Sequence, residues 1–216
     1  AQLPQRVGDA LDRWQLRRDE DVPLRAGYTA LVVPVLRPRG DAGVLKVGWP
    51  HTEADAEHLA LRAWGGQGAV ELLAADPASA TLLLERLDAH RDLRAGSVLG
   101  TTEALGTVLR TLDRPAPPWA PPMSAELGRL AAGLREFAAD PDLSRRFTRR
   151  LVQQTQALVG DLLSDAGADL DGRLVHTDLH QMNALWRPDP GEWVAIDPKT
   201  VAGDPPQPEL KDFIRG

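Results

Sequence analysis

The densest group of residues able to do chemistry lies between residues 175 and 197. An apolar run ending at Val175 leads into a polar loop that holds the carboxylate of Asp178 and, five residues later, the carboxamide of Asn183. A second carboxylate, Asp197, directly follows the apolar run 193–196. These side chains offer oxygen ligands for a hard cation such as Mg²⁺ and a group that can accept a proton.

These groups must meet in space although they are far apart in the sequence. The apolar runs 184–186 and 193–196 are separated by the turn residues 188–191, a pattern that predicts a β-hairpin. Such a hairpin reverses the chain and carries Asp197 back beside Asn183. Magnesium in enzymes often has only one or two protein ligands, because water and substrate phosphates supply its remaining ligands. We therefore expect these two residues to hold the metal, and Asp178 to act on an acceptor hydroxyl.

Phosphoryl transfer fits this set, because it requires alignment and charge neutralisation more than covalent chemistry from the protein. A cation for the nucleotide phosphates is also required. Lys46 is the candidate, since it lies within the apolar strand 43–47, where a charge needs a partner. Glu57 shares a helical face with the apolar residues Ala60, Leu61 and Trp64. We expect Lys46 and Glu57 to satisfy each other as an ion pair.

The elements that position this ion pair are expected in the first ninety residues. Four apolar runs predict two antiparallel strand pairs, 31–36 with 43–47 and 69–74 with 81–87. Between the two pairs, helical spacing extends from Thr52, a plausible N-cap, to Trp64, and Gly65 ends the helix.

The pattern changes after residue 97, where apolar residues recur at helical spacing over 105–112, 127–137 and 152–162. We therefore predict an α+β protein with two lobes. Residues 1–90 form a small antiparallel-sheet lobe with one helix, which binds the nucleotide. Residues 91–216 form a larger, mainly helical lobe that holds the catalytic residues and the acceptor.

Several short motifs together resemble those of the aminoglycoside phosphotransferase family, whose members are relatives of protein kinases. The catalytic segment is represented by His176-Thr177-Asp178, Asn183 and Ile196-Asp197. Within that family the chain most resembles the bacterial streptomycin and hydroxyurea resistance kinases, through Val44-Leu45-Lys46-Val47, Leu82-Leu83-Leu84-Glu85-Arg86-Leu87, Ile196-Asp197-Pro198-Lys199 and Gly203-Asp204-Pro205.

The resemblance implies a two-lobe, protein-kinase-like fold and an ATP-dependent kinase that phosphorylates a hydroxyl of a small molecule such as streptomycin. It implies Asp178 as the catalytic base, Asn183 and Asp197 as Mg²⁺ ligands, and Lys46 with Glu57 as the phosphate-orienting pair. The backbone from Glu85 to Leu87 is implied as the adenine-binding hinge.

The chain departs from the family pattern at a few places. Thr177 stands where many relatives have glycine, and Pro198 replaces the phenylalanine that follows the metal-binding aspartate in protein kinases. The nearest counterpart of the glycine-rich lid is Gly27-Tyr28-Thr29. Relatives continue through several more helices after the metal-binding aspartate, whereas only nineteen residues follow Asp197 here, so the C-terminal lobe is expected to lack helices.

Two alternatives remain open from the residues alone. His176, Asp178 and His180 alternate along the chain and, together with Asp197, could bind zinc in a hydrolase. That reading leaves Lys46 and Asn183 without a role, and a histidine at 176 is more typical of a core residue that shapes the loop. A kinase-like protein that binds a nucleotide or small molecule without efficient transfer is the second alternative.

Composition narrows the possible partners. The chain has no cysteine, which excludes thiolate metal sites and disulfides. A net charge of -6 gives no general attraction to nucleic acid or anionic membranes, but it suits a cationic small-molecule acceptor such as an aminoglycoside. No apolar run approaches the roughly 20 residues that span a bilayer, so a cytoplasmic location is expected. The oligomeric state is left open.

Overall fold

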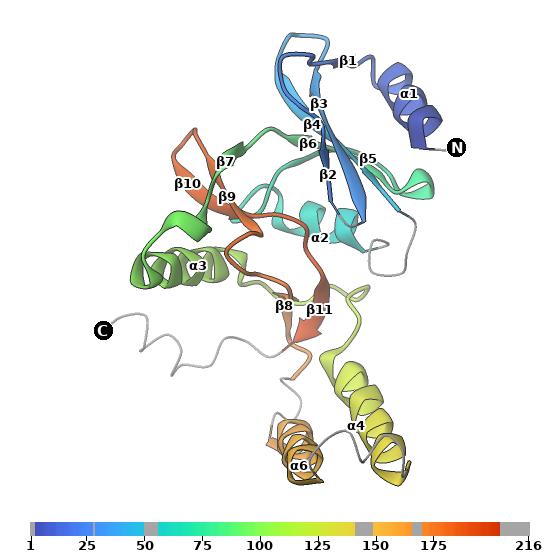
Figure 1. Cartoon of the computed structure of the whole chain (residues 1–216), viewed down its shortest axis with the longest axis vertical. Coiled ribbons are helices and arrows are strands. Elements are labelled where there is room, and N and C mark those ends of the chain that lie inside the picture. Colours follow the sequence, from blue (N-terminus) through green and yellow to red (C-terminus); the bar gives the residue numbers. More distant parts are fainter. Residues whose placement is uncertain (1–2, 28, 50–55, 141–148, 166–169, 204–216) are drawn as a thin grey trace. The chain divides into compact units, whose positions relative to one another are not determined.

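The computed structural model describes residues 3–27, 29–49, 56–140, 149–165 and 170–203 (Figure 1). Two compact units divide the chain: Ala1–Leu112 with Thr177–Lys199, and Asp113–His176 with Thr200–Gly216. The first unit contains every predicted site residue except His176. The limits of the units do not coincide with the lobe boundary expected near residue 90, which stays a prediction.

The first unit contains a six-stranded antiparallel sheet. Its strands are β1 (Arg17–Arg18), β2 (Arg25–Ala26), β3 (Ala30–Leu36), β4 (Ala42–Gly48), β5 (Leu72–Asp76) and β6 (Thr81–Glu85). The order across the sheet is β1, β3, β4, β6, β5, and β2 also pairs with β3. The pairings of β3 with β4 and of β5 with β6 confirm both predicted strand pairs, although β5 lies later in the sequence than the run 69–74.

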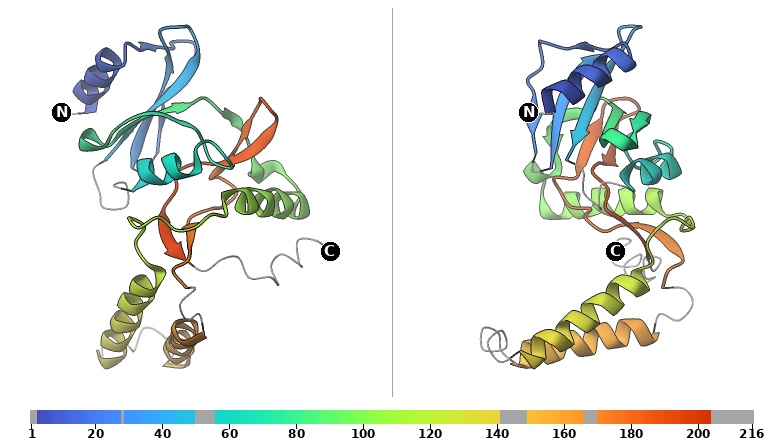
Figure 2. Two further views of the ribbon diagram at one scale, coloured as in Figure 1. Left: turned by 180° about the vertical axis from the view of Figure 1, so that it is seen from behind. Right: turned by 90° about the vertical axis from the view of Figure 1, so that its right-hand side faces the viewer.

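Two helices lie on opposite faces of this sheet (Figure 2). Because side chains alternate along a strand, apolar residues of β3 and β4 such as Val33 and Leu45 point to one face, where they form a buried core with Ala10 of α1 (Leu3–Arg13). Lys46 points to the other face, where it contacts α2 (Glu57–Trp64). The sheet therefore separates an apolar side from the side that carries the predicted chemistry.

The helix α2 ends as its sequence predicts. Gly65 has a φ of 57° and a left-handed conformation, which glycine adopts without a Cβ clash, and its N–H donates to the carbonyl of Leu61. The buried residues of α2 are Glu57, Ala60, Leu61 and Trp64, so the predicted helical face is confirmed. The predicted N-cap Thr52 lies outside the described residues.

A second, three-stranded sheet in the first unit consists of β7 (Asp88–Asp92), β9 (Ala184–Arg187) and β10 (Glu192–Ala195), in the order β10, β9, β7. The helix α3 (Val98–Leu112) packs against β10. Antiparallel pairing of β9 with β10 confirms the predicted hairpin. Two short 3₁₀ turns, η1 (Pro77–Ser79) and η2 (Leu93–Ala95), follow β5 and β7.

The second unit is built from two helices and one strand pair. The helices α4 (Met123–Ala139) and α6 (Arg149–Asp165) pack together and confirm the two predicted helices in this region. The strands β8 (Arg173–His176) and β11 (Thr200–Gly203) pair antiparallel. Among the described residues, each helix is too short or too polar to span a lipid bilayer.

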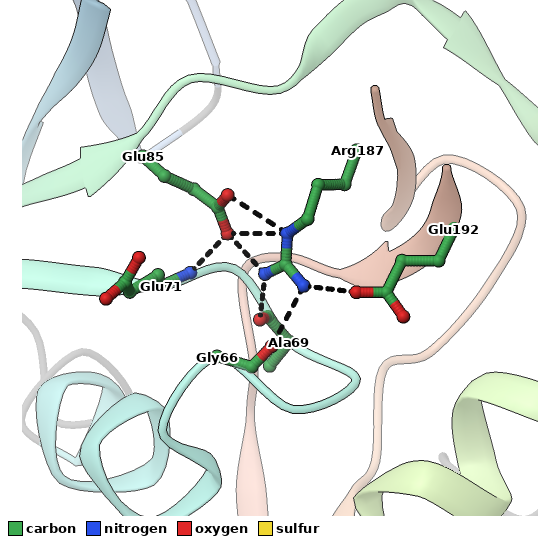
Figure 3. Close-up of polar contacts among 6 residues, drawn as sticks. All are labelled: Gly66, Ala69, Glu71, Glu85, Arg187 and Glu192. Atoms are coloured by element: carbon green, nitrogen blue, oxygen red, sulfur yellow. Dashed lines mark hydrogen bonds and ion pairs between the residues drawn. The ribbon is translucent and has the colours of Figure 1, made fainter. Parts of the chain in front are cut away.

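Arg187, near the turn of the β9–β10 hairpin, forms hydrogen bonds that link three segments of the first unit (Figure 3). Arg187 is only 12 % exposed. Its Nε donates to both carboxylate oxygens of Glu85 at the end of β6, its Nη1 and Nη2 donate to the carbonyls of Gly66 and Ala69 at 3.0 Å each, and Nη1 also reaches Glu192 at 2.5 Å. Burial would lower the pKa of Arg187, but the two carboxylates outweigh it and raise the pKa.

The Arg187 contacts generate a stability prediction. Replacing Arg187 with Met removes the donors from a mostly buried carboxylate and two carbonyls, so the free energy of unfolding should fall by about 3–5 kcal/mol. Glu192→Gln is the matched control, because Glu192 is the most exposed partner (42 %) and its loss should cost less than about 1 kcal/mol. Chemical denaturation measures both. Similar losses for the two variants would contradict the prediction.

Candidate active site

The centre of the candidate site is the ammonium group of Lys46. Its Nζ donates to Glu57 Oε1 and to Asp197 Oδ1, each at 2.6 Å. The side chains of Lys46 and Glu57 are mostly buried, with 14 % and 9 % of their surfaces exposed. Burial alone would lower the pKa of Lys46, but the two carboxylates overcome this effect and raise the pKa. The predicted ion pair is confirmed as a contact, and Asp197 is an additional partner.

The β9–β10 hairpin brings the two predicted metal ligands into neighbouring positions. Ala184 pairs with Ala195, and the N–H of Ile196 donates to the carbonyl of Asn183 at 2.9 Å. Asp197 follows immediately, with a φ of 53°. Such a positive φ is uncommon outside glycine but is adopted by aspartate more readily than by most residues. The turn at Asp197 places its carboxylate at Lys46.

The loop that carries Asp178 is held by its own hydrogen bonds. The amide Nδ2 of Asn183 donates to the carbonyl of Asp178 at 2.9 Å, and the backbone N–H of Asn183 donates to the carbonyl of His180 at 2.8 Å. The Nδ1 of His180 accepts from the N–H of Met182 at 3.2 Å. Asn183 therefore orients its amide oxygen while it shapes the loop around the candidate base.

The carboxylate of Asp178 has two basic neighbours. Its Oδ2 lies 3.3 Å from Lys199 Nζ, and its Oδ1 lies 3.8 Å from His180 Nε2. The Asp178 side chain is 36 % exposed, so it can reach an acceptor from solvent. Lys199 has no place in the predicted set of site residues. Its position two residues after Asp197 is the signal that could have found it, because the same turn sets both.

The predicted hinge residues play a different part from the other site residues. The Glu85 side chain is occupied by Arg187 and by the N–H of Glu71, which donates at 2.7 Å (Figure 3). Glu85 can therefore serve a nucleotide only through its backbone, as the expectation for the Glu85–Leu87 segment states. Leu87 lies in the short connection from β6 to β7, which belong to the two different sheets of the first unit. Arg187 itself could have been found as a charge at the end of an otherwise apolar strand.

Two hollows of the first unit border these residues. One, of about 350 Å³, is lined by Lys46 and Glu57 together with His58, Pro77 and Leu82. The other, of about 430 Å³, lies beside the loop that carries Asp178 and is lined by Thr101, Leu105, Leu179, His180, Gln181 and Met182. Both volumes fall within the range of small-molecule sites.

The zinc alternative is wrong for the residues that the structure describes. Among them, no three His, Cys, Asp or Glu side chains are grouped closely enough to hold a metal ion. His176 is buried in β8 at 4 % exposure, as expected of a core histidine. His180 uses Nδ1 to brace the Asp178 loop. Three residues of the predicted motifs lie outside the described residues: Tyr28, in the counterpart of the glycine-rich lid, and Asp204 and Pro205, in the motif that follows Asp197.

Comparison with known proteins agrees with these motifs. Residues 13–206 match the model of the aminoglycoside/hydroxyurea antibiotic resistance kinase family. The chain is 40 % identical over 207 residues to streptomycin 6-kinase of Streptomyces griseus, a match that covers 95 % of this chain and 64 % of the relative. It is 40 % identical over 221 residues to hydroxyurea phosphotransferase of Kitasatospora aureofaciens, covering 99 % and 62 %. The chain thus spans less than two thirds of the length of these relatives.

Solved structures agree on the fold. Macrolide 2′-phosphotransferase of Brachybacterium faecium is 16 % identical with a TM-score of 0.58, and the match covers 99 % of this chain and 77 % of that one. Choline kinase of Streptococcus pneumoniae is 12 % identical with a TM-score of 0.58, covering 100 % and 80 %. The fold is the predicted α+β, protein-kinase-like one. The chain belongs to the aminoglycoside/hydroxyurea antibiotic resistance kinase family.

Proposed function

We propose that this chain carries the ATP-binding and catalytic residues of a phosphotransferase that moves the γ-phosphoryl group of ATP to a hydroxyl of a small molecule. The observation that carries the proposal is the Lys46 ammonium, shared by Glu57 and Asp197 at 2.6 Å each. A nearly buried cation of fixed orientation is suited to nucleotide phosphates. The hairpin and loop that hold Asn183 and Asp178 adjoin it through Asp197.

Magnesium would be held by Asn183 and Asp197, whose oxygen donors match its preference. The bond from Asn183 Nδ2 to the Asp178 carbonyl directs the amide oxygen, Oδ1, to this role. The Asp197 carboxylate, whose Oδ1 accepts from Lys46, would supply the second oxygen ligand. When bound, the ion neutralises the phosphate oxygens.

Asp178 is the proposed base. Its carboxylate accepts the proton of the acceptor hydroxyl while the hydroxyl oxygen forms a bond to the γ-phosphorus and the bond to the β,γ-bridging oxygen breaks, which releases ADP. Asn183 supports Asp178 by fixing the backbone of the loop, and Lys46 holds the remaining phosphates.

The proposed acceptors are those of the two named relatives, streptomycin and hydroxyurea, because the chain is equally identical to both. Streptomycin is favoured by charge, since it is cationic and the chain carries a net charge of -6. A screen with MgATP should compare both compounds with other aminoglycosides and a neutral sugar, and should detect the phosphorylated acceptor directly. MgADP binding without any phosphorylated product would favour a nucleotide-binding protein without efficient transfer.

Asp178→Asn tests the proposed base. The variant keeps the shape of the side chain but cannot accept the proton, so kcat should fall about 10²- to 10⁴-fold. Affinity for MgADP should change less than about threefold. Asp9→Asn is the control, because Asp9 is an exposed aspartate of α1 and should leave kcat unchanged. Transfer by Asp178→Asn at the rate of the unchanged chain would contradict the mechanism.

Glu57→Gln tests the phosphate-orienting pair. Loss of the negative charge weakens one of the two charge-assisted bonds that orient Lys46, so KM for ATP should rise about tenfold. Glu103→Gln removes an exposed glutamate from α3 and should leave KM unchanged. Steady-state kinetics at saturating acceptor measure both variants. An unchanged KM for ATP in Glu57→Gln would show that the ion pair does not orient Lys46 for the nucleotide.

A further inference from the structure

Lys199 is attached to the catalytic loop through both its backbone and its side chain. The carbonyl of Lys199 accepts two hydrogen bonds from Thr177, from the N–H at 2.8 Å and from the hydroxyl Oγ1 at 3.0 Å. The ammonium Nζ lies 3.3 Å from Asp178 Oδ2. Thr177 directly precedes the candidate base Asp178. Its two hydrogen bonds therefore hold the backbone of Lys199 next to the carboxylate that the Lys199 ammonium contacts.

The turn between Asp197 and Lys199 sends two side chains to different partners. Asp197 has a φ of 53° and is followed by Pro198, whose ring restricts the backbone further. As a result the Asp197 carboxylate meets Lys46 at 2.6 Å, while the Lys199 ammonium meets Asp178 at 3.3 Å. One short segment therefore supplies a negative charge to the nucleotide side of the site and a positive charge to the acceptor side.

The acceptor side needs a positive charge under the proposed reaction. The equatorial oxygens of the phosphoryl group carry negative charge during transfer, and the Asp178 carboxylate close to them would repel it. The Lys46 ammonium already contacts two carboxylates. Lys199 contacts the Asp178 carboxylate at 3.3 Å. Its charge lies where it can offset that repulsion.

The choice of lysine at this position is informative. The chain has 25 lysine and arginine residues in total, and only three of them, at 46, 199 and 211, are lysine. Two of the three lysines thus belong to the candidate site. An ammonium is a compact charge with three donors and can contact a carboxylate and a phosphoryl oxygen together, whereas a guanidinium prefers a bidentate bond with the carboxylate alone.

We propose, on the basis of the proposed function, that Lys199 is a further catalytic residue whose ammonium bridges the Asp178 carboxylate and the phosphoryl group in transfer. The hydroxyl oxygen bonds to the γ-phosphorus, the bond to the β,γ-bridging oxygen breaks, and Asp178 receives the hydroxyl proton. Lys199 gives up no proton. Its role is to stabilise the charge on the transferring group and to keep Asp178 Oδ2 in place.

The kinetic test compares Lys199→Met and Lys199→Arg with the unchanged chain, with MgATP as donor and streptomycin and hydroxyurea as acceptors. Lys199→Met should lower kcat about 100-fold and change KM for ATP less than about threefold, because the lost charge acts on the group in transfer. Lys199→Arg should recover at least about a tenth of kcat. Arg13→Met removes an exposed cation paired with Asp76 and should leave kcat unchanged.

A binding measurement needs no acceptor. MgADP with fluoroaluminate mimics the planar phosphoryl group, and calorimetry gives its affinity for each variant. Lys199→Met should bind MgADP as the unchanged chain does and lose about tenfold in affinity only when fluoroaluminate is present. Equal affinity of both proteins for the fluoroaluminate complex would overturn the role of Lys199 and leave the proposed function intact. Failure of the unchanged chain to bind MgADP would overturn both.

Discussion

The interaction on which the site depends most is the placement of one nearly buried ammonium, that of Lys46, between two carboxylates. A charge so far from water is costly unless hydrogen-bonded partners surround it, and removal of one partner leaves the others unbalanced. Glu57 lies 11 residues away in the sequence and Asp197 lies 151 residues away. The positions of β4, α2 and the turn after β10 are therefore constrained together, and the neighbouring loop of Asp178 is aligned through the same hairpin.

The elements with a regular local pattern could be predicted from the sequence. The β3–β4 hairpin, the buried face of α2 and its end at Gly65, and the pairing of β9 with β10 all follow from the spacing of apolar and turn residues. The Lys46–Glu57 contact could be predicted for a related reason. Lys46 is a charge in the otherwise apolar strand β4, and Glu57 is a charge on the apolar face of α2. Each is therefore the natural partner of the other.

Other features depend on contacts that no local pattern encodes. The strands β7 and β11 are short and lack an alternation of apolar residues, and β1 and β2 have only two residues each. The Arg187–Glu85 contact joins residues 102 positions apart. Lys199 reaches Asp178 after a left-handed turn at Asp197. The residue types at 197–199 do not by themselves reveal this backbone conformation. The sequence could mark Arg187 and Lys199 as candidates, but their partners become known only when the tertiary structure brings the segments together.

The geometry of the β9–β10 hairpin also bears on how distant relatives can be found. Its pairing runs from Ala184 with Ala195 to Arg187 with Glu192, so the candidate ligands lie at one end and residues 188–191 at the other. The ion pair between Arg187 and Glu192 closes the ladder before the turn. Residues inserted in that turn would lengthen an outer loop at little entropic cost and would leave the inner end unchanged. Relatives can therefore differ in the number of residues between Asn183 and Asp197. The hydrogen-bond register of β9 with β10 is a better guide to equivalent residues than this spacing.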